Sequence, residues 1–195
     1  QVIAIRTCCN LLFDHSIREA VVKSGILLTL EKTLENPFFD AEVMNQIFLA
    51  LLSLCTNSSF MESISKTNIP SILIHLVLQV RANPSSSSSS MTSSSSALIQ
   101  EKEFEIITKI LGMLAYDLKS RLFLQKKEFL LLIFQLIKQR IDSPSVVWCI
   151  FALRHLIVDY AIPHELFEIG IKSTLLTIHD AFQQQIKRLS GGASA

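Results

Sequence analysis

Apolar residues recur at every third or fourth position along nearly the whole chain, which is the spacing of one face of an α-helix. The strict alternation of apolar and polar residues that marks a β-strand is absent. Only 5 Gly and 5 Pro interrupt the pattern. The sequence therefore predicts an all-α protein.

Four segments share one layout, in which an apolar helix ends in Asp or Asn. They read "RTCCNLLFD" (residues 6–14), "LALLSLCTN" (49–57), "KILGMLAYD" (109–117) and "FALRHLIVD" (151–159). The offsets between them are 43, 60 and 42 residues. After each segment we expect a short helix, a turn at Gly25, Asn68, Glu128 or Gly170, and then a second apolar helix. A period of this length is typical of helical repeat proteins.

The one long offset contains the serine-rich stretch "NPSSSSSSMTSSSS", residues 83–96. We interpret residues 83–99 as a loop inserted into one repeat, between its second and third helices, because the period resumes in register beyond it. Residues 1–185 then form a single domain, followed by a flexible tail at 186–195. The loop is expected to be flexible and solvated. Phosphorylation of its serines or of Thr92 is the alternative, although the flanking residues favour no particular kinase.

A repeat of about 42 residues with a short first helix, a turn often made by Gly and a long third helix resembles the armadillo family, with HEAT repeats as a close neighbour. The third helix of armadillo proteins reads roughly Trp-Ala-Leu-x-Asn-Leu-Ala, and "RTCCNLL", "LALLSLC", "KILGMLA" and "FALRHLI" occupy that frame. The resemblance implies a right-handed superhelix of about four repeats. The first and last repeats are incomplete, because the chain starts within a third helix (residues 2–12) and ends after a second helix (171–185). We expect either excision from a longer solenoid or atypical end caps.

The resemblance also implies a partner-binding groove lined by the third helices. Its two groove-facing positions hold Arg6, Asn10, Leu49, Ser53, Lys109, Met113, Phe151 and His155. Asn10 alone matches the asparagine of the family motif, so the peptide ladder of nuclear-import proteins is not carried over. The mixed row would suit an extended or helical protein segment with apolar anchors and an occasional carboxylate. For Leu49, Met113 and Phe151, packing against the next repeat is an equal alternative.

Charge and cysteine content narrow the classes of partner and compartment. Lys and Arg number 18 against 17 Asp and Glu, giving a net charge of +1, so no nucleic-acid partner is expected. The longest apolar runs are far shorter than the roughly 20 residues of a membrane span, so no membrane insertion is expected either. Cys8, Cys9, Cys55 and Cys149 lack the paired spacing of a zinc site. We expect a reducing compartment, the cytoplasm or the nucleus.

The residue types that could serve in catalysis or metal binding are better explained by structural roles. The recurrent Asp14, Asn57, Asp117 and Asp159 are placed to stabilise turns or cap helices. The cysteines align with apolar core residues of other repeats. The five histidines form no metal-binding pair, and neither a Gly-rich phosphate loop nor a nucleophile elbow is found. We expect no enzyme, no cofactor and no metal.

Three functions remain. The first is a non-enzymatic scaffold or adaptor that binds a peptide or helix of a partner protein. The alternative, from the resemblance, is a small-GTPase regulator or effector-binding domain, an exchange factor or formin-like. In the third, the segment only spaces or dimerises parts of a larger protein.

Overall fold

The structure, a computed structural model, describes residues 2–36, 41–79, 101–141, 143 and 145–158, together with residues 173, 176, 179 and 180. Every regular element in these ranges is an α-helix, and they contain no β-strand. The prediction of an all-α protein is confirmed. The expected turn at Gly170, the cap at Asp159, most of the helix at 171–185, the serine loop and the tail at 186–195 lie outside the described residues.

The helices follow one order, a short helix, a longer second one and then a third. After α1 (Val2–Phe13) come α2 (Arg18–Lys23), α3 (Ile26–Leu34) and α4 (Ala41–Leu54). The next triplet is α5 (Ser58–Ser65), α6 (Ile69–Gln79) and α7 (Glu101–Tyr116), and the last is α8 (Leu118–Leu124), α9 (Lys127–Gln139) and α10 (Val146–Val158). We call α2, α5 and α8 the first helices, α3, α6 and α9 the second helices, and α1, α4, α7 and α10 the third helices.

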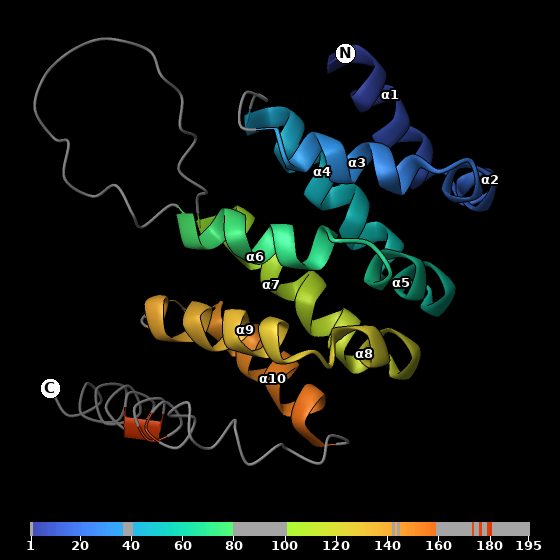
Figure 1. Ribbon diagram of the computed structural model, residues 1–195. Helices are drawn as coiled ribbons and strands as arrows, with labels where there is room; N and C mark the ends of the chain where they lie inside the picture. The colour runs from blue at the N-terminus through green and yellow to red at the C-terminus, as the bar shows by residue number, and fades with distance from the viewer. Residues whose placement is uncertain are drawn as a thin grey trace, which may run out of the picture.

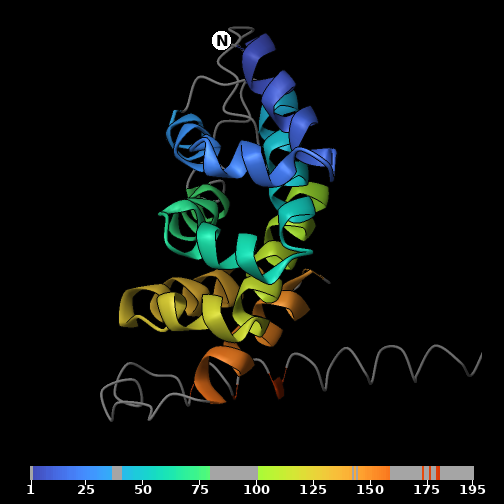
Figure 2. The same ribbon diagram turned by 90° about the vertical axis from the view of Figure 1, so that its right-hand side faces the viewer.

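Each class of helix packs against its own kind. The third helices contact one another in series, α1 on α4, α4 on α7 and α7 on α10. The second helices do the same, α3 on α6 and α6 on α9, and α5 packs on α8. Figure 2 shows the second and third helices as two adjacent columns, and Figure 1 shows the first helices gathered at one end of the layers. The triplets are therefore stacked rather than folded around one centre.

The core is one continuous cluster of buried apolar side chains that runs through all the triplets. The third helices contribute most because they are covered by a neighbouring third helix as well as by their own triplet. In α7, buried positions such as Phe104, Ile107 and Leu111 cover more than one face, and Thr108 joins them with its hydroxyl bonded to the Glu105 carbonyl at 3.0 Å. This explains why the third helices read as almost continuously apolar.

The serine-rich stretch falls between α6 and α7, which end and begin at Gln79 and Glu101. α7 nevertheless contacts α4, α5 and α6, and α9 contacts α6. Helices from before and after the stretch thus pack directly together. No helix in the described ranges has the length and apolar content that crossing a bilayer requires.

Three of the predicted turns lie among the described residues. Asn68 falls between the end of α5 and the start of α6, so this turn is confirmed. Gly25 precedes α3 with φ of 89°, a left-handed conformation that favours glycine, so the predicted turn is confirmed. The turn predicted at Glu128 is wrong by two residues: Lys126 is extended (φ −110°, ψ 141°), and α9 begins at Lys127. Glu128 lies in the first helical turn, where its negative charge suits the helix dipole.

Candidate functional site

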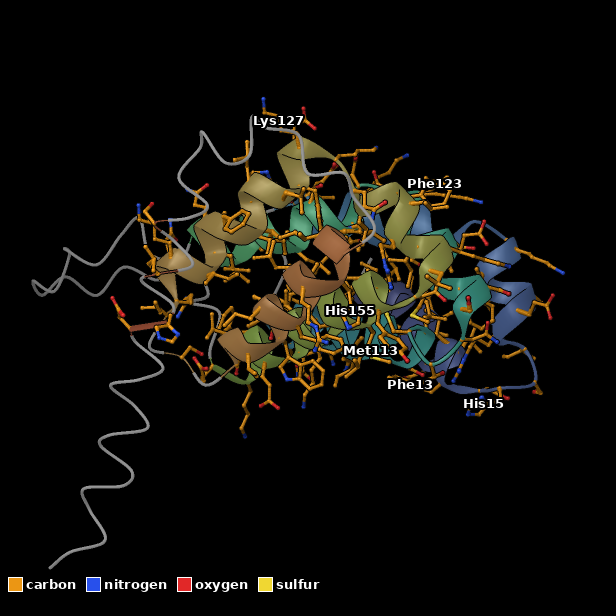
Figure 3. The ribbon with its side chains drawn as sticks, turned by 90° about the horizontal axis from the view of Figure 1, so that it is seen from below. Phe13, His15, Met113, Phe123, Lys127 and His155 are labelled. Carbon is orange, nitrogen blue, oxygen red and sulfur yellow. The ribbon has the colours of Figure 1, made fainter. Side chains whose placement is uncertain are left out.

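All eight predicted groove residues lie on the third helices, and none of them is fully buried. Asn10 on α1 and Leu49 on α4 are exposed, whereas the other six are partly buried. Viewed along the stack, Figure 3 places Phe13, Met113 and His155 on one side of the molecule and Phe123 and Lys127 on the other. We call the solvent-accessible side of the four third helices the third-helix face.

The two predicted cations of this face already hold carboxylates. Arg6 Nη2 lies 2.7 Å from an oxygen of Glu42 in the first turn of α4. Lys109 Nζ lies 2.5 Å from Glu105 Oε1, one turn earlier on α7, and 6.0 Å from the centre of the Trp148 ring. Both pairs are partly exposed to solvent, so each contributes little to stability. A partner carboxylate would have to compete with Glu42 or Glu105 for these cations.

Ser53 is occupied within the fold. Its hydroxyl accepts a hydrogen bond from Arg18 Nη2 at 3.1 Å, which joins α2 to the third helix of the same triplet. Ser53 therefore has a structural role, which the groove alignment did not anticipate.

Four rings form the most distinctive feature of the third-helix face, where α7 meets α10. Phe151 lies 4.4 Å from His155, 6.0 Å from Trp148 and 6.1 Å from Tyr116, measured between ring centres. Tyr116 and His155 are 5.2 Å apart, edge to face. We call these four side chains the ring cluster. Phe151 and His155 were predicted for the groove, whereas Trp148 and Tyr116 were not.

Gly112 on α7 makes room for this arrangement. A Cβ atom at this position would lie 3.2 Å from Cε3 of Trp148 and 3.5 Å from Cδ1 of Phe151. The first of these distances is tighter than an ordinary contact, so any side chain at this position would push the indole outward. The absent side chain lets two rings of α10 pack directly on the α7 backbone.

Tyr116 is the most exposed member of the ring cluster, with 62% of its surface accessible, and the three α10 rings are partly buried. Rings held against one another and partly open to solvent have the character of interface anchors, because a partner can bury them without first ordering them. Arg154, the neighbour of His155, is exposed on the same helix.

The recurrent acidic and amide residues cap helices, as predicted. The Asn57 side chain accepts from the Ser59 backbone N–H at 2.9 Å at the start of α5. Asp117 accepts from the Ser120 N–H at 2.9 Å at the start of α8, and from the Ser58 hydroxyl at 2.5 Å.

The carboxyl groups of this column have lowered pKa values. Partial burial raises the pKa of Asp117, but the hydrogen bonds from Ser58 and Ser120 outweigh it and leave the pKa below its ordinary value. Asp14 accepts from both the hydroxyl and the backbone N–H of Ser16, which likewise lowers its pKa. These carboxylates stabilise the start of a helix or turn and form no acidic cluster.

Two buried arginines, which sequence reasoning missed, close the ends of third helices. Arg18 is 4% exposed, and its Nε donates to the Leu12 carbonyl at 2.6 Å while its Nη2 donates to the Phe13 carbonyl at 3.2 Å. Arg121, 7% exposed, donates in the same way to Ala115 at 3.0 Å and Tyr116 at 3.0 Å. A guanidinium satisfies the last carbonyls of a helix and complements the negative end of its dipole. The available signal was that each arginine stands four residues after a recurrent aspartate.

Three of the four cysteines, Cys9, Cys55 and Cys149, are buried core residues, as predicted. Burial raises the pKa of Cys9 to about 11, and it raises the pKa values of Cys55 and Cys149 to about 12. Cys8 is partly exposed and packs against the core. In the part of the chain that the structure describes, His, Cys, Asp and Glu residues form no group of three that could hold a metal ion.

Comparison with protein-family models, with curated proteins and with solved structures gave no match for this chain.

Proposed function

We propose that the chain is an armadillo-like repeat domain, coiled as a right-handed superhelix, that binds a segment of a partner protein on its third-helix face. The succession of triplets supports the armadillo assignment over HEAT repeats, because each triplet begins with a separate short helix of six to eight residues. Stacking of like helices on like supports a solenoid, in which each unit contacts its neighbours. The proposed activity is binding, without catalysis.

The ring cluster is the observation that carries the binding proposal. Tyr and Trp are the residue types most enriched among interface hot spots, and here they lie on two adjacent third helices with Phe151 between them. Trp148, Phe151 and His155 follow one another at spacings of three and four residues, so they form a single stripe along α10. An apolar anchor from an extended or helical partner segment would pack on this stripe.

The polar groups on α7 and α10 indicate which charged and hydrogen-bonding groups a partner segment would carry. Lys109, Arg154, the Tyr116 hydroxyl and the imidazole of His155 can donate hydrogen bonds, and Glu105 is the carboxylate paired with Lys109. A segment that places a carboxylate beside its apolar anchor fits this set better than a basic segment, which would meet Lys109 and Arg154. The row that continues along the stack, Asn10 and Leu49, would contact the remainder of a longer segment.

The experiment is selection of binders from a displayed library of random peptides on the purified chain, followed by calorimetric titration of the selected sequences. Tyr116→Ala is the first variant, because the exposed ring can be removed with little effect on the fold. Phe151→Ala is the second, with helical content checked by circular dichroism. Leu28→Ala is the matched control, since Leu28 is 60% exposed on α3, among the second helices.

We expect selected peptides to combine an aromatic or aliphatic residue with a nearby Asp or Glu. Tyr116→Ala and Phe151→Ala should weaken binding about tenfold or more, and Leu28→Ala should leave it unchanged. Equal affinity of all three variants would place the binding site away from the ring cluster. Exchanging Arg6 and Lys109 for Glu together is a secondary test, because it also breaks the pairs with Glu42 and Glu105.

A further inference from the structure

The connection between α9 and α10 brings Arg140 and Ser143 together in a tight turn. The backbone N–H of Ser143 donates to the Arg140 carbonyl at 2.9 Å, the bond that closes a β-turn and holds the two Cα atoms within about 7 Å. The hydroxyl of Ser143 donates to Glu101 Oε1 in the first turn of α7, and the Ser145 hydroxyl donates to the same oxygen at 3.2 Å. The partly exposed Ser143 thus ties this turn to the start of α7.

Arg140, three residues before Ser143 in this turn, carries unused hydrogen-bonding capacity. Its guanidinium carbon lies 5.1 Å from the centre of the Phe104 ring, and its Nε and Nη2 are buried without a hydrogen-bond partner among the residues that the structure describes. A buried donor of a charged group that lacks an acceptor is destabilising, and an acceptor brought to it is bound correspondingly well. The same turn therefore carries a cation with two unsatisfied donors and, three residues later, a partly exposed serine.

The sequence marks the same serine. The five prolines are preceded by Asn36, Ile69, Asn83, Ser143 and Ile162, so Ser143 is the one Ser or Thr in the chain that is followed by Pro. Kinases that require Pro after the acceptor residue would distinguish Ser143 from every serine of the tract at 83–96. The serine-rich stretch itself offers such a kinase no acceptor.

We propose that Ser143 is a phosphorylation site for a proline-directed protein kinase, and that Arg140 binds the phosphate. The Ser143 oxygen attacks the γ-phosphorus of ATP, the bond from that phosphorus to the bridging oxygen of ADP breaks, and the hydroxyl proton passes to the kinase. The product carries close to two negative charges and acceptor oxygens that Arg140 Nε and Nη2 can bond.

The same event removes the tie to α7. A phosphorylated Ser143 has no hydroxyl proton to donate, and its negative charge repels Glu101. Glu101 is the first residue of α7, at the end of the connection from α6. Phosphorylation therefore exchanges a contact to the start of α7 for a contact within the α9–α10 turn.

The test treats the folded chain with an active mitogen-activated protein kinase, Mg²⁺ and ATP, and maps the phosphate by mass spectrometry. Incorporation is expected at Ser143, lost in Ser143→Ala and retained in Ser145→Ala. A peptide of residues 136–150 serves as the positive control for the kinase. Absence of phosphate at Ser143 in the folded chain overturns the site, whether or not the peptide is modified.

The role of Arg140 is tested on the phosphorylated protein by following the phosphorus NMR signal of Ser143 against pH. A bound guanidinium stabilises the dianion, so the second pKa of the phosphate should lie below that of the phosphorylated peptide. Arg140→Gln should raise it to the peptide value, and Arg140→Lys should restore part of the shift. Circular dichroism confirms that the variants are folded. A phosphate pKa that is the same in Arg140→Gln as in the parent protein overturns the contact.

Discussion

The outer junctions between a third helix and the next first helix differ from the middle one. At α1–α2 and α7–α8 a buried arginine donates to the last carbonyls of the third helix. At α4–α5 the equivalent position holds Met61, a partly buried apolar residue. The repeat register thus tolerates two solutions to the same backbone problem, a charged cap and a packed thioether.

A second position, on the third helix that follows, varies together with the position of Arg18, Met61 and Arg121. Arg18 also donates to Ser53 on α4. In the repeat register, the pair Arg18 and Ser53 corresponds to Met61 and Met113, and then to Arg121 and His155. Where the first position is arginine the second is polar, and where the first is methionine the second is also methionine. This is expected, because a buried charge needs a hydrogen-bond partner and a polar group facing an apolar side chain would be left unpaired.

The largest effect is expected from Arg121→Met, which places at the α7–α8 junction the residue type found at the α4–α5 junction. The carbonyls of Ala115 and Tyr116 would lose their donors inside a stack that is packed on both sides. We expect the free energy of unfolding to fall by about 2–3 kcal/mol, measured by urea denaturation. A loss of only a few tenths would mean that methionine packing compensates fully.

Arg18→Met should have the same sign and a smaller size, about 1–2 kcal/mol. It removes the bonds to Leu12, Phe13 and Ser53, but α1 packs on another third helix on one side only in the described structure. Part of the loss should appear as fraying of α1, seen as faster amide hydrogen exchange in residues 2–13. Unaltered exchange in α1 would contradict this explanation.

The capping residues give the next comparison. Asp117→Ala and Asn57→Ala should each cost about 1 kcal/mol, the ordinary value of an N-cap. Asp117→Ala should cost more of the two, because Asp117 also accepts from Ser58 on α5 and so joins two first helices. Thermal unfolding of the two variants side by side decides it, and a larger effect of Asn57→Ala would contradict the contact to Ser58.

Met61→Arg sharpens the comparison in the opposite direction. An arginine here could donate to the carbonyls of Cys55 and Thr56, which stand where Leu12 and Phe13 stand for Arg18. Because Met113 offers no polar partner, we expect at most about 1 kcal/mol of stabilisation. Met61→Ala is the matched control for lost packing. Destabilisation by Met61→Arg beyond that of Met61→Ala would show that the middle junction cannot accept the charge.

The smallest expected difference between the junctions is in how much stability each loses at low pH. The pKa values of Asp14 and Asp117 are lower in the folded chain than the ordinary 3.8, so their contribution to stability is complete above that value and is lost as the pH falls through the folded pKa. Asn57 does not titrate in this range. The free energy of unfolding is measured from pH 6 to pH 2. Its dependence on pH should be slightly weaker in Asp117→Asn than in the parent chain. In the control Asn57→Asp, it should not change with pH above pH 5.

Much of the fold could be predicted from local patterns. The helical period, the turn at Gly25 and the caps at Asn57 and Asp117 depend on residues close in sequence, and these expectations are confirmed. Glu128 was misplaced because a glutamate suits both a turn and a first helical turn. Arg18 and Arg121 were missed because arginine is usually exposed, and only the ends of the preceding helices explain their burial.

The candidate site was less accessible to sequence reasoning. The stripe of Trp148, Phe151 and His155 can be read from spacing along α10, but the addition of Tyr116 depends on how closely α10 approaches α7 at Gly112. The carboxylate partners of Arg6 and Lys109 depend on rotamers and on contacts between helices. Pattern gives a row of positions, and only the crossing of the helices decides which side chains meet.

The long connection between α6 and α7 gives the stack a mechanical property. α4, α5 and α6, which precede this connection, contact α7, α8 and α9, which follow it, and the covalent link between the two sets runs from Gln79 to Glu101. Fully extended, that link could span roughly 70 Å. Under tension the contacts of α4 with α7, α5 with α8 and α6 with α9 would therefore open before the chain became taut, and the two sets of helices would stay joined at a distance from which these contacts could re-form. The covalent connection would thus keep the two sets of helices close enough to re-associate after their interface has opened.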